Sequence, residues 1–119
     1  MKQLNAKGIV LYDFENDILL FKVKERDYSY SVEYENIVFD IDTKDFLTGI
    51  QIFDASKVFN TDKISLKNLG KWNFTAKIEN GIISVNLTFE TITRNKVFIS
   101  NLVREATSPL KDSEVICAV

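Results

Sequence analysis

Residues 72–89, WNFTAKIENGIISVNLTF, decide how the second half of the chain folds. Apolar and polar residues alternate on both sides of Asn80-Gly81, and this dipeptide favours a tight hairpin turn because both of its residues tolerate positive φ. A two-residue turn fixes which residues face each other. It sets apolar residues opposite apolar ones, in the pairs Ile78–Ile83, Ala76–Val85, Phe74–Leu87 and Trp72–Phe89. Turn chemistry and hydrophobic pattern therefore predict the same β-hairpin, with these pairs on its buried face.

The sequence after this hairpin predicts further strands. A strand over Lys96 to Val103 follows a turn at Arg94-Asn95, and the simplest two-residue loop would place Phe89 opposite Ser100. We expect a one-residue β-bulge instead, which brings Phe89 opposite Ile99. The tail then predicts a last strand at the edge of the sheet, with the alternating residues Val115, Cys117 and Val119.

The first half of the chain also predicts strands, separated by turns rich in Asp and Asn. The predicted strands are Ile9 to Tyr12, Ile18 to Lys24, Tyr28 to Tyr34, Ile37 to Ile41 and Leu47 to Phe53. Asp54 or Ser56 is expected to cap a short turn after the last of them. Asn60 or Thr61 then caps a predicted helix of about two turns, with Gly70 at its end.

These elements together predict one α+β domain over residues 1–119, with a predominantly antiparallel, meander-like or sandwich-like sheet and one short connecting helix. Residues 1–59 form a β-rich half, residues 60–70 the helix, and residues 71–119 a β-meander half. A sandwich and an open barrel both stay open as architectures. Free strand edges favour a homodimer, because exposed edges are generally paired, covered or charged.

The composition excludes several kinds of chemistry. The chain has no histidine and one cysteine, which rules out Ser-His-Asp and Cys-His nucleophiles and histidine-ligated metal sites. Cys117 is expected to be a small buried residue, since one thiol forms neither an internal disulfide nor a structural zinc site. We predict no catalytic residue, no cofactor and no metal site.

Neither nucleic acid nor a membrane is an expected partner. The net charge of −2 lacks the excess of Lys and Arg that nucleic-acid binding needs. Lys71, Trp72, Phe74 and Lys77 mix basic and aromatic side chains as single-strand binding surfaces do, but the hairpin register buries the two rings. The longest apolar runs, at residues 8–12 and 18–21, are far shorter than the roughly 18 residues of a membrane span. Residues 1–7 also lack the apolar core of a signal peptide, so a cytoplasmic location is expected.

Acidic side chains gather in two predicted turns, Asp13, Glu15 and Asp17 in the first and Asp40, Asp42 and Asp45 in the second. The first turn lacks the glycine that a calcium loop requires after Asp17, so ordinary turn chemistry is the favoured interpretation. Paired carboxylates act as general acid and base only in contrasting environments. A solvated turn is the favoured interpretation of the second cluster.

Tyr28, Tyr30 and Tyr34 are spaced to share one face of a strand. Tyrosine is enriched at protein interfaces because its ring is apolar while its hydroxyl stays hydrated. Two interpretations remain: an interaction face, or a border of the core whose hydroxyl groups reach solvent.

Four segments in the first half carry a further signal: Tyr12-Asp13, Asn16 to Leu19, Phe39 to Asp42, and Gly49 to Lys57. Together they resemble the uncharacterised prokaryotic family called domain of unknown function 2283, and the last segment, GIQIFDASK, is the most specific. The chain differs in having Gln51 where the family usually has Glu, and in adding about 60 residues downstream. If that Glu does acid–base or ligand work in the family, Gln51 cannot do it here.

This resemblance implies a small β-rich protein without an assigned activity. Some members of the family are encoded beside toxin-like partners, which implies an antitoxin-like or other protein-binding role. The leading hypothesis is therefore a non-enzymatic protein-interaction module that binds a partner chain or self-associates. The alternative is a small-ligand-binding protein or carboxylate-based enzyme that uses Asp13, Asp17, Asp40 or Asp54. That alternative requires at least two of these carboxylates to converge on one pocket.

Overall fold

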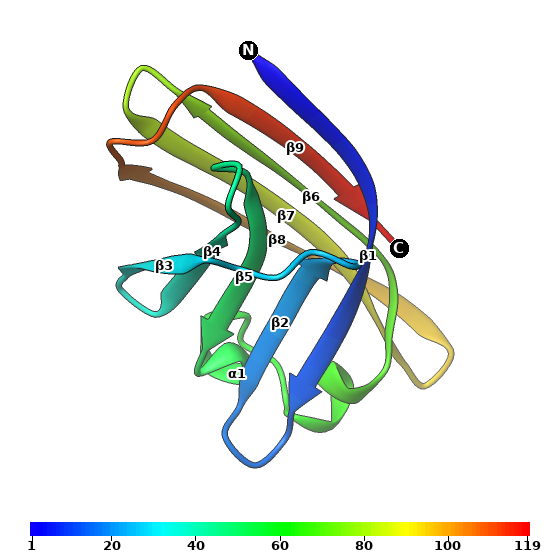
Figure 1. Cartoon of the computed structure of the whole chain (residues 1–119). Coiled ribbons are helices and arrows are strands. Elements are labelled where there is room, and N and C mark those ends of the chain that lie inside the picture. Colours follow the sequence, from blue (N-terminus) through cyan, green and yellow to red (C-terminus); the bar gives the residue numbers. More distant parts are fainter.

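The computed structural model describes the whole chain, residues 1–119 (Figure 1). Its strands are β1 (Lys2–Asp13), β2 (Ile18–Val23), β3 (Tyr30–Tyr34), β4 (Ile37–Ile41), β5 (Leu47–Phe53), β6 (Leu69–Glu79), β7 (Ile82–Thr93), β8 (Lys96–Thr107) and β9 (Ser113–Ala118). A short helix, α1 (Ala55–Val58), and a 3-10 turn, η1 (Ile64–Lys67), join β5 to β6. Neither helical segment has the length or the apolar character needed to cross a membrane.

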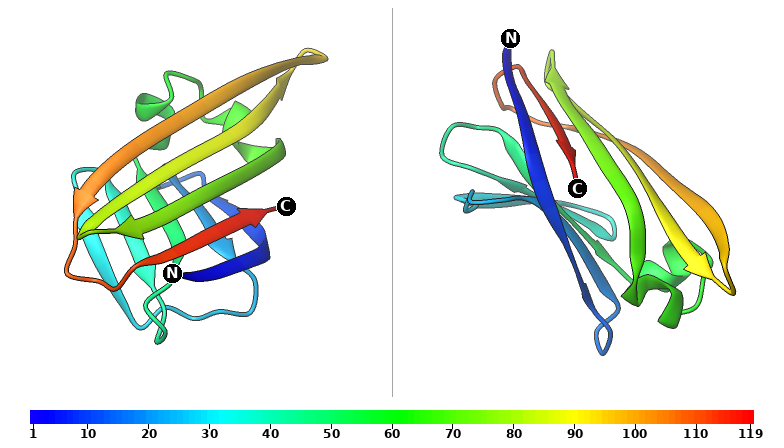
Figure 2. Two further views of the ribbon diagram at one scale, coloured as in Figure 1. Left: turned by 90° about the horizontal axis from the view of Figure 1, so that it is seen from above. Right: turned by 90° about the vertical axis from the view of Figure 1, so that its right-hand side faces the viewer.

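The nine strands form one bent sheet in the order β3-β4-β5-β2-β1-β9-β6-β7-β8. β1 takes part in both arms of the bend: residues 2–7 pair in parallel with β9, and residues 8–13 pair antiparallel with β2. The predicted antiparallel pairing therefore holds for most of the sheet, but the β1–β9 pair makes it a mixed sheet. The two arms face each other as a half-barrel that is open between β3 and β8 (Figure 2).

Gly8 lies where β1 passes from one arm to the other, opposite Val23 of β2. A Cβ atom at this position would lie 2.4 Å from Cys117 Sγ, and 2.6 Å from both the Lys22 carbonyl oxygen and the Trp72 ring. Only glycine leaves room for this close approach of the two arms.

The predicted hairpin over residues 72–89 is confirmed in every pair, from Ile78–Ile83 to Trp72–Phe89. Asn80 and Gly81 both have positive φ, at 54° and 78°, as a two-residue hairpin turn requires. Trp72, Phe74, Leu87 and Phe89 are buried in a single core of 24 residues that the inner faces of both arms supply. The hairpin therefore supplies much of the buried face of one arm, and the inner faces of the strands in the first half pack against it.

The predicted helix over residues 60–70 is wrong. The segment contains only the 3-10 turn η1, and Leu69 and Gly70 already belong to β6. So short a helix is unstable alone, because nucleation costs more than its few hydrogen bonds return. Pairing of Leu69 with Thr91 of β7 holds the segment extended instead.

The bulge expected in β8 is also wrong, since Phe89 lies opposite Ser100. Arg94 and Asn95 adopt positive φ, at 53° and 62°, and so form the simple two-residue turn. Phe89 needs no apolar partner from β8, because the rings of Phe21 and Phe59 lie against it at centroid distances of 5.8 and 4.7 Å. Ile99 consequently points away from the core.

Two strand starts and the position of the last strand also differ from the prediction. β1 begins at Lys2, seven residues before Ile9. β3 begins at Tyr30, which leaves Tyr28 in the preceding loop. β9 is a strand as predicted, but it lies between β1 and β6 inside the sheet and not at its edge. The edges are β3 and β8.

Candidate functional site

The turn between β1 and β2 is fastened to the start of α1 by the carboxylate of Asp17. The Tyr12 hydroxyl donates to Asp17 Oδ1 at 2.6 Å, and the Ser56 hydroxyl donates to Oδ2 at 2.6 Å. The backbone N–H of Ser56 also donates to this carboxylate, at 3.1 Å. Asp17 therefore caps α1 from a distant turn, whereas the predicted cap residue Asp54 makes no side-chain cap bond. We call Tyr12, Asp17 and Ser56 the clasp.

The negative charge of Asp17 has a structural role, because the ionised carboxylate accepts the hydrogen bonds of the clasp. Burial acts to raise the pKa of Asp17, but the hydrogen bonds from Ser56 and Tyr12 outweigh it and hold this pKa below its usual range. Burial and the neighbouring carboxylate raise the pKa of the Tyr12 hydroxyl, which stays protonated. A carboxylate held ionised by three donors is a poor general acid or base near neutral pH.

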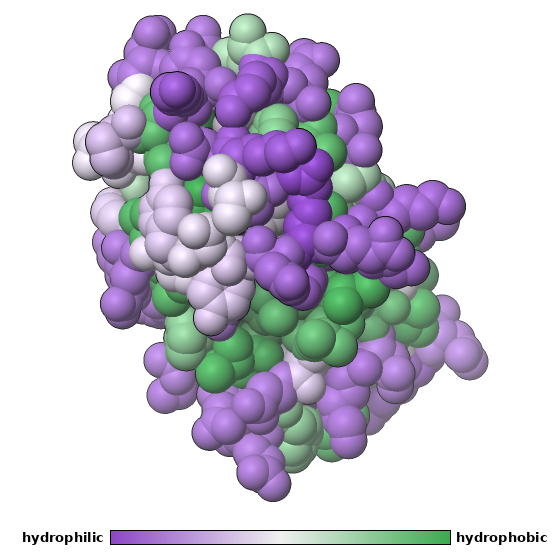
Figure 3. Space-filling view, in the orientation of Figure 1, coloured by the Kyte–Doolittle hydropathy of each residue, from purple (hydrophilic) through white to green (hydrophobic).

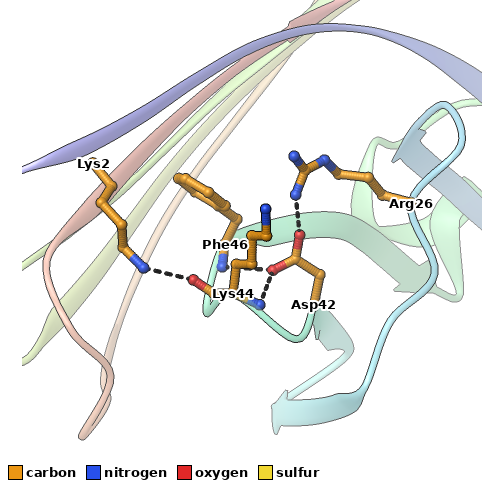
Figure 4. A network of polar contacts seen from close by, with 5 residues as sticks. All are labelled: Lys2, Arg26, Asp42, Lys44 and Phe46. Carbon is orange, nitrogen blue, oxygen red and sulfur yellow. Dashed lines mark hydrogen bonds and ion pairs between the residues drawn. The ribbon is translucent and has the colours of Figure 1, made fainter.

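Asp42 fastens a second turn, between β4 and β5 (Figure 4). Its Oδ1 atom accepts the backbone N–H groups of Lys44 and Phe46 at 2.9 and 3.0 Å, and its Oδ2 atom pairs with Arg26. Lys2, at the start of β1, donates to the Lys44 carbonyl oxygen at 2.8 Å. The expectation of a solvated turn is wrong for Asp40 and Asp42, which are both buried, and Asp42 joins this turn to the loop that holds Arg26.

Among the four carboxylates of the alternative hypothesis, that of Asp40 lines a hollow. The hollow has a volume of about 260 Å³ and lies on the outer face of β2, β4 and β5. Asp40 is buried and accepts hydrogen bonds from the Gln51 amide at 3.0 Å and from the Ser31 hydroxyl at 2.8 Å. A Glu at position 51 would place two carboxylates side by side here.

The other three carboxylates lie elsewhere. Asp40 lies in the same row of the sheet as Lys22 of β2. Asp17, just before β2, is five residues from Lys22, which corresponds to about 16 Å along an extended strand. Asp13 bonds to Asn16 in its own turn, and Asp54 is exposed at the start of α1. No group of three or more Cys, Asp or Glu side chains is placed to hold a metal ion. The convergence that a carboxylate-based enzyme requires is not present among these four residues.

The three tyrosines do not share one face. Tyr30 and Tyr34 point to the inner side of β3, and Tyr34 lines a pocket with Ile82 and Ala106 at the open side of the half-barrel. Burial and the charge of Asp45 raise the pKa of Tyr30. Tyr28, in the loop before β3, lines the hollow beside Asp40 on the opposite face. The prediction that all three share one face is therefore wrong, and a part in binding for any of them stays a prediction.

Three further residues singled out from the sequence are buried. Trp72 and Phe74 stack inside the core, while Lys71 and Lys77 point to solvent, so these four do not form a stacking surface for bases. Cys117 is fully buried, and burial raises the pKa of its thiol to about 11.

An apolar patch on the outer face of β1, β2 and β5 was not singled out from the sequence (Figure 3). Leu11 lies opposite Leu20 and Ile18 lies opposite Phe53, all with side chains turned away from the core. Leu11 is 54% exposed and Phe53 is exposed as well. We call Ile9, Leu11, Ile18, Leu20 and Phe53 the outer patch. The sequence signals this patch by two unbroken apolar runs, at residues 8–12 and 18–21. A strand with one face in water would instead alternate apolar and polar residues.

Comparison with known proteins places the chain in a family. The family model described as a protein of unknown function (DUF2283) matches residues 9–56, from the second half of β1 to the Ser56 of the clasp. An uncharacterized protein of Methanocaldococcus jannaschii is 35% identical over 108 residues, which cover 88% of this chain and 93% of that protein.

A protein of Methanosarcina mazei named a putative hypoxanthine phosphoribosyltransferase is 31% identical over 86 residues, which cover 72% of this chain and 70% of that protein. No solved structure matches the chain. Tyr12, Asp17 and Ser56 all lie within the matched residues and meet in the clasp, so they have a common structural role here. On the match to the family model and the similarity to the Methanocaldococcus protein, the chain belongs to the DUF2283 family, a family of unknown function.

Proposed function

We propose that this protein is a non-enzymatic binding module that holds a partner protein on its outer patch. The observation that carries the proposal is that residues 8–12 of β1 and residues 18–21 of β2 are apolar on both faces, while only the inner face packs against the core. Strands that are apolar on both faces are typical of sheets covered on both sides. A contiguous exposed apolar patch is a common mark of a protein-binding surface.

The position of the outer patch supports the same proposal. All five of its residues lie within residues 9–56, the part that the family model matches. The clasp and the Asp42 turn brace the two ends of these strands, so the patch is held on a rigid scaffold. The antitoxin-like role that the family resemblance implies would use such a surface.

Phosphoribosyl transfer, to which the name of the Methanosarcina relative points, finds less support in this chain. Phosphate groups are commonly bound by free backbone N–H groups at the start of a helix. Here α1 has four residues, and the N–H of Ser56 already donates to the Asp17 carboxylate. An anion at this place would meet a negative charge, so the geometry favours protein binding.

The substitution Leu11→Lys tests the proposal. Full burial of a leucine side chain contributes about 1.5–3 kcal/mol, so a charge at this position should weaken the complex by about 10-fold or more. Ile64→Lys is the matched control, because Ile64 is 72% exposed on η1, outside the patch.

The readout is native mass spectrometry of the tagged chain isolated from the cells that express it naturally. We expect a stoichiometric partner that remains with the wild type and with Ile64→Lys and is lost from Leu11→Lys. Circular dichroism checks that both variants are folded. Absence of any stoichiometric partner, or a partner that Leu11→Lys retains, would overturn the proposal.

A further inference from the structure

We infer that the free edge of β8 pairs with β8 of a second copy of this chain, antiparallel and about a two-fold axis at Asn101. β8 is the last strand of the sheet and is 12 residues long. Val97, Phe98, Ile99 and Val103 are all exposed along it, and Ile99 is 71% exposed. A long apolar edge of this kind is a template for another strand. The opposite edge, β3, has five residues, of which Glu33 is charged and exposed.

The turn at residues 94–95 fixes which backbone groups of β8 are free. Thr93 and Lys96 close a two-residue hairpin turn and therefore form a hydrogen-bonded pair. Bonded and non-bonded pairs alternate along an antiparallel ladder, so the even-numbered residues of β8 bond to β7. The odd-numbered residues, from Val97 to Glu105, direct their N–H and C=O groups to the free edge. In agreement, the Val103 carbonyl oxygen accepts a hydrogen bond from the Arg104 side chain at 2.9 Å.

The sequence of β8 is self-complementary in one register, the one centred on Asn101. It places Ile99 opposite Val103 of the second copy twice over, and Asn101 opposite its own counterpart, while Val97 lies opposite Glu105. On the inner face, Arg104 lies opposite the ring of Phe98 of the second copy, a favourable cation–π arrangement. About ten backbone hydrogen bonds would join the two edges.

The neighbouring registers match less well. Centring the pair on Ser100 sets Lys96 opposite Arg104 twice, and like charges directly opposite each other are destabilising. Centring it on Leu102 sets Ile99 opposite Glu105 and Val103 opposite Asn101, so both of these residues lose the apolar partner that the Asn101 register gives them. Charge and apolar matching together therefore select a second copy in the Asn101 register as the partner of this edge.

The test combines two substitutions with sedimentation equilibrium and mild oxidation. Ile99→Lys places a charge at two positions of the symmetric contact and should weaken dimerisation at least about 100-fold, whereas Ile64→Lys should leave it unchanged. Asn101→Cys brings two thiols together at a hydrogen-bonded pair, where the Cα atoms are about 5.5 Å apart, and this suits a disulfide. It should form a covalent dimer, while Asn86→Cys, an exposed position on β7, should not.

A chain that stays monomeric up to roughly millimolar concentration would overturn the inference. So would a dimer that Ile99→Lys leaves intact, or one in which Asn101→Cys does not cross-link. The β8 edge and the outer patch lie on different arms of the sheet, so Leu11→Lys should not change this dimer. Loss of the patch partner and loss of the dimer are therefore separate results.

Discussion

Replacing Gly8 by alanine should destabilise the fold strongly, because this residue is the place where the two arms of the sheet touch. The added Cβ would overlap Cys117 Sγ at 2.4 Å and the Lys22 carbonyl oxygen and Trp72 ring at 2.6 Å. A backbone carbonyl and a buried indole ring cannot move aside separately. Overpacking in a core generally costs about 1–3 kcal/mol, and we expect about 3 kcal/mol here because three rigid groups meet the new methyl group. That is a large part of the 5–15 kcal/mol by which domains are usually stable.

Urea unfolding followed by tryptophan fluorescence measures this effect, since Trp72 is the one tryptophan and lies at the contact. Gly70→Ala is the matched control. There the nearest atom to a new Cβ, at 2.7 Å, is the end of the flexible Glu90 side chain, so the expected cost is below about 1 kcal/mol. Equal costs for the two substitutions would refute the account of how β1 joins the arms.

Three further predictions concern the clasp, the hollow at Asp40 and the Cys117 thiol. Asp17→Ala should cost about 2–3 kcal/mol at neutral pH through loss of the clasp. Since the folded-state pKa of Asp17 is lowered, that difference should shrink as pH falls below about 4, in urea titrations at several pH values. Gln51→Glu should put a second carboxylate about 3 Å from Asp40 and raise the pKa of the introduced group. Its destabilisation should therefore be absent near pH 4 and reach about 1–3 kcal/mol by pH 7, whereas a pH-independent effect would contradict the pairing. The Cys117 thiol, buried and with a pKa of about 11, should react with a thiol reagent only as fast as the chain opens, and Gly8→Ala should accelerate it.

Local sequence signals predicted the strands whose turn and pattern agree. The hairpin at Asn80-Gly81 is the best case, because two-residue turn geometry and apolar pairing specify one register. Parallel pairing of β1 with β9 could not be read from the sequence in this way. It joins residues near opposite ends of the chain, and no turn between them fixes a register.

The failures at β8 and at the outer patch have a common physical cause. The predictions rest on the rule that each strand has one face in water. That rule favours a bulge that turns Ile99 to the core, and it gives no role to the outward residues of the apolar runs near Leu11 and Leu20. The structure keeps these side chains outside. Departures from local consistency are expected where a surface has a function, and here they mark the two surfaces proposed for binding.

The clasp illustrates a different limit. Tyr12, Asp17 and Ser56 lie in segments that carry the family resemblance, but their common contact depends on a turn and a helix start that lie 39 residues apart. Sequence spacing alone does not show that the Asp17 carboxylate accepts hydrogen bonds from both Tyr12 and Ser56.

Hydroxyl-radical footprinting of the assembly isolated from cells tests the proposed binding surfaces most directly. In the single chain the side chains of Leu11, Ile99 and Ile64 are 54%, 71% and 72% exposed, so all three should be labelled readily after dilution to the monomer. In the assembly we expect Leu11 and Ile99 to be protected while Ile64 stays labelled. If Leu11 and Ile99 are labelled in the assembly as strongly as Ile64, neither surface holds a partner and the account is wrong.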